Sequence, residues 1–250
     1  MTTRWNRAIA LLSAALVLSL ALNAFLALAG IRFHRRLTRA RLDPLGAGGA
    51  APGAAERIAS GGKPTVVFLG DSRARAWPPP ASITNAVFLN HGIDGQTTAQ
   101  ILGRFARQIG PLKPDVVVLQ AGVNDLRMIP FVPADSPTII ENCKRNIERT
   151  VGESLACGAR VVLTTIFPLG SPPLDRRILG VREITDAINE VNGFLVSLAG
   201  DRVSIFDTGR ILADESGAVA SVYAADFLHL NDAGYAALNR ELAGCLIRRY

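Results

Sequence analysis

The sequence has few of the residues that bind metals or form disulfide frameworks. Its 250 residues include three cysteines and three histidines. They are scattered along the chain, without the paired spacing of a zinc site or an HExxH pattern. We therefore expect no metal site, and we expect the cysteines to be small buried or half-buried side chains. The six residues are Cys143, Cys157, Cys245, His34, His91 and His229.

The sequence also lacks an excess of charge outside its N-terminal region. The net charge is +6, but seven of the 27 basic residues and none of the 21 acidic residues lie within residues 1–41. The rest of the chain therefore has 20 basic and 21 acidic side chains and is nearly neutral. This balance argues against binding of nucleic acid through its phosphate backbone. The N-terminal arginines instead suit the anionic head groups of a membrane.

One long hydrophobic run is present, from residue 8 to residue 31. It contains no charged side chain and is long enough to cross a bilayer as a helix. We expect residues 1–41 to form an N-terminal membrane anchor with its span at 8–31. A cleaved signal peptide is the alternative, because the Ala-Leu-Ala sequence at 27–29 fits a cleavage site. Five arginines follow the run and two precede it, which would place the rest of the chain in the cytoplasm; the side of the membrane stays open.

A stretch rich in glycine and alanine follows the arginines. Residues 46–51 superficially match a dinucleotide-binding pattern, but no apolar strand precedes them. We expect a flexible linker at 42–63, followed by one folded domain at 64–250.

Short apolar runs alternate with longer helical patterns along this domain. The runs are too uniformly apolar for a sheet with one face in water, so both faces should be covered. Strands are expected at 65–69, 87–90, 116–120, 161–165 and 203–206, and helices at 97–109, 137–157, 181–198 and 233–249. The alternation predicts an α/β fold, a three-layer αβα sandwich around a five-stranded parallel sheet.

Unusual polar residues follow the strands, where the functional groups of parallel sheets gather. Ser72 ends a Gly-Asp-Ser sequence after the first run, a stretch with two glycines at 90–98 follows the second, and Asn124 follows the third. Asp226 and His229 lie in the last loop before the final helix. Plain structural roles stay open for each of them, such as helix caps and turn residues.

These residues have the chemistry needed to cleave an ester through a covalent intermediate. Ser72 is the candidate nucleophile and His229 the candidate base, because a neutral imidazole can take and return a proton at physiological pH. Asp226 lies three residues before His229, close enough in a tight turn to orient its ring. The backbone N–H groups of Ser72 and Gly95 and the side-chain amide of Asn124 are candidate donors to the oxyanion.

Together the four segments resemble the GDSL, or SGNH, hydrolases in order and approximate spacing. That family has a Ser in Gly-Asp-Ser, a Gly, an Asn in Gly-x-Asn-Asp and a C-terminal Asp-x-x-His. The matching residues are Ser72, Gly95, Asn124, Asp226 and His229. The resemblance covers residues 64–250 and implies the flavodoxin-like SGNH hydrolase fold, a Ser-His-Asp triad, an acyl-enzyme intermediate and no cofactor. The flanking residues look most like the acetylhydrolase and carbohydrate-esterase subgroup.

A few positions depart from the usual family pattern. Arg73 and Ala74 follow the serine where the family often has an apolar residue and a threonine. His91 stands where arginine is common, and Leu230 where a proline is common. We expect a solvated Arg73 and a structural His91, with a role in substrate choice as the alternative for both. None of these departures removes a catalytic group.

We therefore expect a membrane-tethered serine esterase acting on a small-molecule, glycan or lipid ester with an acetyl or other short acyl group, with the tether inferred from the apolar run and the activity from the resemblance. Two alternatives use the same residues: an O-acyltransferase to a glycan hydroxyl, and a catalytically silent member that only binds ligands. The apolar segment 126–138 is expected either to wall the acyl pocket, with Trp77, or to pack on the core. The acyl length, the alcohol and the oligomeric state stay open.

Overall fold

A computed structural model of the chain describes residues 2–45, 62–172 and 180–247. The chain divides into two compact units, one ending at Pro44 and one beginning at Leu45. Residues 46–61, which include most of the predicted linker and the dinucleotide-like stretch, lie outside the described residues. All of the candidate catalytic residues belong to the larger unit.

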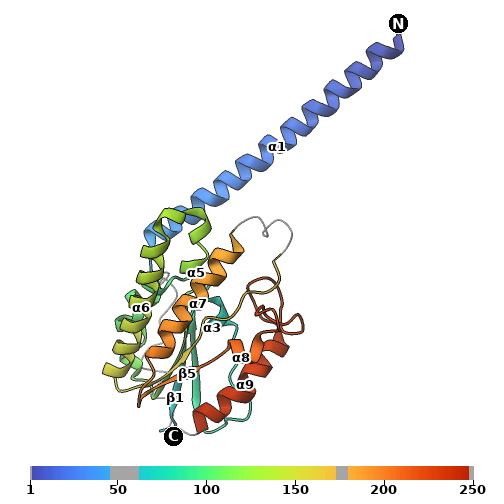
Figure 1. Cartoon of the computed structure of the whole chain (residues 1–250). Coiled ribbons are helices and arrows are strands. Elements are labelled where there is room, and N and C mark those ends of the chain that lie inside the picture. Colours follow the sequence, from blue (N-terminus) through green and yellow to red (C-terminus); the bar gives the residue numbers. More distant parts are fainter. Residues whose placement is uncertain (1, 46–61, 173–179, 248–250) are drawn as a thin grey trace. The chain divides into compact units, whose positions relative to one another are not determined.

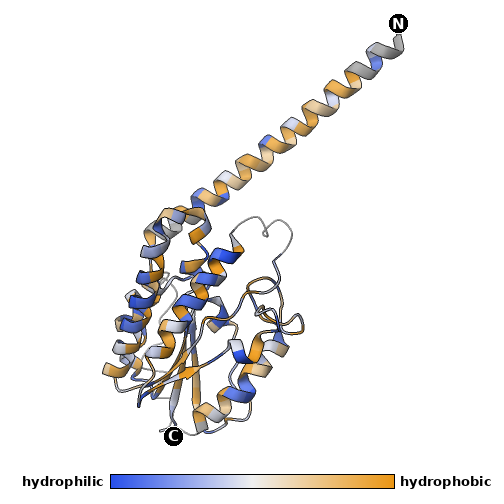
Figure 2. Ribbon diagram, in the orientation of Figure 1, coloured by the Kyte–Doolittle hydropathy of each residue, from blue (hydrophilic) through white to orange (hydrophobic). Residues whose placement is uncertain are grey.

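The smaller unit contains one long helix, α1, Thr2–Leu42. Its segment Ile9–Arg35 has a mean hydropathy of 2.3 and is long enough to cross a bilayer. Figure 2 shows apolar residues along most of its length. A signal sequence near an N-terminus passes the same test of length and composition. The expected apolar run is therefore a helix of a kind found in both membrane anchors and signal sequences.

The larger unit is built on a five-stranded parallel sheet, as the sequence predicts, and its strand order is β2-β1-β3-β4-β5. The observed ends lie within two residues of the expected ones. The strands are β1 (Thr65–Gly70), β2 (Val87–Gly92), β3 (Val116–Gln120), β4 (Arg160–Thr164) and β5 (Val203–Phe206). Since β1 lies between β2 and β3, the segments that follow these three strands meet at one edge of the sheet.

Helices cover both faces of the sheet, which confirms the three-layer prediction (Figure 1). One face carries α4 (Thr98–Gln108), α6 (Ser136–Ala156) and α7 (Val181–Ser197), and the other carries α8 (Gly209–Leu212) and α9 (Asp232–Ile247). Short helices fill the loops: α3 (Ser72–Arg75), η1 (Gly110–Leu112), α5 (Val123–Leu126), η2 (Ile129–Phe131) and η3 (Pro133–Asp135).

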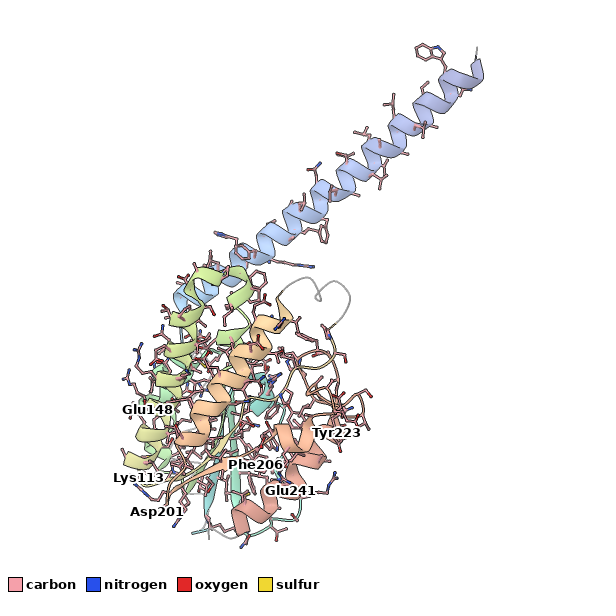
Figure 3. All side chains as sticks on the ribbon, in the orientation of Figure 1. Lys113, Glu148, Asp201, Phe206, Tyr223 and Glu241 are labelled. Carbon is pink, nitrogen blue, oxygen red and sulfur yellow. The ribbon has the colours of Figure 1, made fainter. Side chains whose placement is uncertain are left out.

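Alternate side chains of β1 build the two halves of the core. Val67 and Leu69 pack with the helices of the first face, and Val66 and Phe68 pack with those of the second. All four are at most 1% exposed, so each contributes on the order of 1.5–3 kcal/mol to folding. Figure 3 shows that apolar side chains of the sheet lie inside and charged side chains of the helices lie outside. Phe206 of β5 is buried, whereas Glu148 of α6 and Glu241 of α9 are exposed.

The end of β1 is packed too closely for any residue but glycine. A Cβ atom added at Gly70 would lie 1.8 Å from the carbonyl oxygen of Gln120 and 2.8 Å from the Cβ of Ala74. The backbone of β3 and the side chain of Ala74 in α3 therefore approach Gly70 directly. This close approach fixes the turn that carries Ser72.

Candidate active site

Ser72 is the first residue of α3, directly after the turn that ends β1. The helix cap is Asp71, whose Oδ1 accepts a hydrogen bond of 2.9 Å from the backbone N–H of Arg73. Ser72 is therefore not needed as the cap, and its hydroxyl makes a different contact. Its Oγ lies 3.1 Å from Nε2 of His229, a residue 157 positions further along the chain.

The other ring nitrogen of His229 faces Asp226. Nδ1 of His229 lies 2.9 Å from Oδ2 and 3.2 Å from Oδ1 of the carboxylate. Oδ1 also accepts hydrogen bonds from the backbone N–H groups of Leu228, at 2.6 Å, and His229, at 2.7 Å. Burial raises the pKa of Asp226, but these hydrogen bonds outweigh it and lower the pKa to about 2. An ionised carboxylate thus faces Nδ1, which favours the tautomer with a free Nε2 lone pair toward Ser72.

Two predicted oxyanion donors, Gly95 and Asn124, lie in the segments after β2 and β3. Gly95 has φ +73°, a conformation that side chains other than glycine rarely adopt. Asn124 is buried, and its Nδ2 donates a 3.0 Å hydrogen bond to the carbonyl of Gln96. That bond uses one of the two amide N–H groups and leaves the second to donate elsewhere.

The predicted nucleophile, base and oxyanion residues line one cavity of about 660 Å³. Ser72, Gly95, Asn124 and His229 contribute to it, together with three charged side chains that were not predicted to lie there. These are Arg75, Asp94 and Arg127. Another cavity, of about 560 Å³, lies beside α7, and none of the predicted catalytic residues lines it.

Asp125, next to Asn124, ties the two oxyanion segments together. Its carboxylate accepts a 2.9 Å hydrogen bond from the backbone N–H of Thr98 and a 2.7 Å one from its hydroxyl. Thr98 is the first residue of α4, and the segment before it contains Gly95. Burial raises the pKa of Asp125, and the bonds from Thr98 oppose that rise. These hydrogen bonds therefore fix the position of the segment that carries Asn124 relative to the segment that carries Gly95.

The expectation of a solvated Arg73 was wrong. Its side chain is fully buried, and Nε donates to the carbonyl of Leu228 at 2.8 Å. Nη1 donates to the carbonyl of Phe167 at 3.0 Å, and Nη2 to that of Pro168 at 3.4 Å. Burial lowers the pKa of Arg73 to about 10, which still leaves it protonated at neutral pH. Arg73 therefore connects the Ser72 turn with the loop after β4 and with the residue that precedes His229.

A second buried arginine, Arg104, supports the oxyanion side and was missed by the sequence analysis. Nε of Arg104 donates to Oε1 of Gln96 at 2.7 Å, and Nη2 donates to the carbonyl of His91 at 2.7 Å. Nη2 also lies 3.3 Å from the carbonyl of Gly70. Burial lowers the pKa of Arg104 to about 10. The sequence offered one usable signal, since Arg104 falls on the apolar stripe of α4 with Ile101.

His91 and Trp77 both pack in the interior. His91 is 5% exposed, and burial together with the charge of Arg104 lowers its pKa to about 4; it has the surroundings of a structural histidine. Trp77 is 1% exposed and donates from Nε1 to Oδ1 of Asn239 at 2.8 Å. Trp77 does not line the cavity at Ser72, so its expected part in an acyl pocket was wrong.

The segment 126–138 is not a wall of the cavity either, apart from Arg127. Leu126 and Ile129 are buried in the core, whereas Phe131 is 66% exposed. The prediction of a segment packed on the core therefore fits better than that of an acyl pocket.

The three cysteines are free thiols, Cys143 buried and the other two half-buried, as expected. In the described part of the chain, no group of three or more His, Cys, Asp or Glu side chains is placed to hold a metal ion.

A serine, a histidine and an aspartate in successive contact, beside amide donors in one cavity, define a site of the serine hydrolase type. Comparison with protein families matches residues 57–237 to the GDSL-like Lipase/Acylhydrolase family. The chain belongs to this family, and it is an ester-hydrolysing enzyme.

Individual relatives agree with this assignment. The alpha1 subunit of platelet-activating factor acetylhydrolase IB from Pongo abelii is 28% identical over 194 residues, which cover 74% of this chain and 77% of that protein. A solved GDSL-like lipase from Bacteroides thetaiotaomicron has a TM-score of 0.59 at 22% identity, covering 85% of this chain and 98% of its own. A solved carbohydrate acetylesterase from Sinorhizobium meliloti has a TM-score of 0.58 at 16% identity, and the match covers 75% of this chain and 100% of that chain. These two structures share the fold.

Proposed function

We propose that this enzyme is a membrane-tethered serine esterase that releases a short acyl group through an acyl-enzyme intermediate. The observation that carries the proposal is the chain of contacts from Ser72 Oγ to His229 Nε2 and from His229 Nδ1 to Asp226. A base within 3.1 Å of the hydroxyl can take its proton as the oxygen attacks an ester carbonyl.

The reaction runs in two halves. Ser72 Oγ bonds to the carbonyl carbon, His229 accepts the serine proton and then gives it to the leaving alcohol, and the acyl group stays on Ser72. In the second half His229 takes a proton from water, the hydroxide oxygen bonds to the acyl carbon, and Ser72 leaves with the proton that His229 returns. Asp226 holds the ring and stabilises its charged form in both halves.

The negative charge that develops on the carbonyl oxygen needs donors. The backbone N–H groups of Ser72 and Gly95 and the free N–H of Asn124 are proposed for this role. The open space around Gly95 supports close approach of a substrate, because no atom lies within 4 Å of an added Cβ. Preorganised donors of this kind typically contribute about 3–4 kcal/mol of transition-state stabilisation each.

The acyl group is proposed to be acetyl or similarly short. The names of the relatives support this, since one is an acetylhydrolase and one a carbohydrate acetylesterase. A small-molecule, glycan or lipid alcohol is compatible with the open cavity of about 660 Å³. A panel of p-nitrophenyl esters from acetate to octanoate should give the highest kcat/KM at the short end.

The central test is Ser72→Ala in the purified full-length chain in detergent. We expect hydrolysis of p-nitrophenyl acetate to fall by at least about 10³-fold, because the attacking oxygen is removed. The matched control is Ser197→Ala, at an exposed serine at the end of α7. A fluorophosphonate probe should label the wild type and Ser197→Ala but not Ser72→Ala.

Undiminished turnover by Ser72→Ala would overturn the assignment of the nucleophile. A wild-type chain that neither reacts with the probe nor turns over esters would instead be a ligand-binding member of the family. Adding a glycan acceptor to the same assay separates hydrolysis from acyl transfer, because transfer yields an acylated acceptor in place of free acetate.

A further inference from the structure

The cavity at Ser72 carries more positive charge than the proposed ester chemistry uses. Arg75 and Arg127 both line it, and Asp94 is the one acidic side chain among its lining residues. Arg75 and Asp94 form an ion pair of 2.8 Å with both side chains more than half exposed. The charge of Arg75 is therefore matched within the cavity, and that of Arg127 is not.

Arg127 is held close to the oxyanion side of the site. It is the C-cap of α5, three residues after Asn124, and its backbone N–H donates to the carbonyl of Val123 at 3.0 Å. Its side chain is half-buried. Within residues 2–45, 62–172 and 180–247, its guanidinium makes no hydrogen bond or ion pair.

Two carboxylates in neighbouring segments are already engaged with other groups. Asp125 accepts two hydrogen bonds from Thr98, and Asp226 faces His229. Arg73 lies near enough for the charge of Arg127 to lower its pKa further, after the larger effect of burial. Arg127 is thus a half-buried cation with another cation nearby and no matched anion among the described residues, an arrangement that a bound anion would stabilise.

We propose that Arg127 is an anion subsite, and that this esterase prefers esters whose alcohol part carries a carboxylate or a phosphate close to the scissile bond. The inference rests on the proposed function, because it concerns the substrate of the Ser72 site. A guanidinium presents a planar fork that matches either group with two parallel hydrogen bonds. A short acyl group has no room for a charge of its own, which is why the charge is assigned to the alcohol.

Three acetate esters of similar size test the proposal on the full-length chain in detergent. Two are anionic, 4-acetoxybenzoate and 4-acetoxyphenyl phosphate, and 4-acetoxybenzamide is neutral. Rates are corrected for those of Ser72→Ala, and the readout is the ratio of kcat/KM between each anionic ester and the neutral one. Comparing this ratio between variants cancels the different intrinsic reactivities of the esters.

Arg127→Gln should lower the anionic-to-neutral ratio by about 10- to 100-fold for at least one of the two anionic esters. Arg127→Lys keeps the charge without the fork and should fall between Gln and wild type. Arg107→Gln is the matched control, since Arg107 is exposed on α4 and its loss changes the net charge equally. It should leave the ratio within about twofold of wild type, because an exposed charge outside the cavity is screened.

The outcomes separate the two proposals. An unchanged ratio in Arg127→Gln for both anionic esters, with the neutral ester still cleaved, overturns the anion subsite and leaves the esterase function standing. An equal fall in Arg107→Gln also overturns it, because the effect would then come from net charge alone. If the wild type cleaves none of the three esters faster than Ser72→Ala, the esterase function fails and the subsite with it. A fall for one anionic ester alone identifies the carboxylate or the phosphate as the group bound.

Discussion

Asp71 is an unusual acid because it is fully buried next to the proposed nucleophile. One oxygen accepts from the backbone N–H of Arg73, and Oδ2 has no partner among the described residues. Burial raises the pKa of Asp71 to about 6, against the opposing charge of Arg73. Between about pH 4 and about pH 6 the folded chain therefore binds more protons at this group than the unfolded chain does. The free energy of unfolding falls as pH rises through that window.

Asp71→Asn should remove this dependence, because an amide can accept the same capping bond and does not ionise. We expect the stability of Asp71→Asn relative to wild type to rise by up to about 3 kcal/mol between pH 4 and pH 7. Denaturant unfolding of the full-length chain at the two pH values measures it. Asp201→Asn is the control, since the side chain of Asp201, which is labelled in Figure 3, is exposed. Equal pH slopes for Asp71→Asn and wild type would contradict the prediction.

Single residues also mark the limit of what the sequence predicts at the site. Ser72, Asp226 and His229 were proposed from the sequence because their residue types match a known chemistry, with Ser72 directly after the first strand and the other two in the loop before the final helix. Arg73 was wrongly expected to be solvated, and no position was predicted for the side chains of Arg104 and Arg127, because an arginine in a sequence is normally read as solvated. The buried guanidinium of Arg73 donates hydrogen bonds to the carbonyl groups of residues 167, 168 and 228. These residues are distant in the sequence, so no local pattern shows that they contact Arg73.

At the scale of elements, Arg73 joins three segments that are distant in sequence: α3, the loop after β4 and the loop that carries His229. Arg73→Met should lower the free energy of unfolding by about 2–4 kcal/mol, since the carbonyls of Leu228 and Phe167 would lose their donors in the interior. It should also lower kcat more than it raises KM, because the loop before His229 loses its anchor. Calorimetry and ester kinetics measure the two effects.

The control for this change is Arg149→Met at an exposed position of α6, which removes the same charge. Arg73→Lys should recover part of the stability, because an ammonium group can bond some of the carbonyls but has no fork. If Arg73→Met proved as stable and as active as Arg149→Met, the anchoring role would be refuted.

The five strands and the four long helices of the domain were predictable from the sequence to within two residues at their described ends, whereas the short helices in the loops were not predicted. Strands such as β3, Val116–Gln120, are short and rich in apolar, mostly β-branched residues, which favours a doubly covered strand over a helix. The loops were harder, because their conformation depends on long-range contacts. The segment 126–138 is apolar in the sequence, yet the structure divides it between core residues such as Ile129 and exposed ones such as Phe131.

For the whole molecule, we propose three parts: a membrane anchor at 1–41, a linker at 42–63 and the catalytic domain at 64–250. The described residues of the domain contain the two halves of the core, the sheet and every proposed catalytic residue. The apolar segment Ile9–Arg35 accounts for the proposed tether. Catalysis and attachment are thus assigned to separate stretches of the chain.

Removing residues 1–63 tests this division. The full-length chain should sediment with membranes and resist carbonate extraction, because a helix of this length and hydropathy partitions into the hydrocarbon core. The truncated chain should be soluble and should cleave p-nitrophenyl acetate with a kcat within about twofold of the detergent-solubilised full-length chain, since the triad does not depend on the anchor. Recovery of the mature protein in soluble form with an N-terminus near residue 30 would show a cleaved signal peptide and contradict the anchor. Loss of folding in the truncated chain would contradict the domain boundary at residue 64.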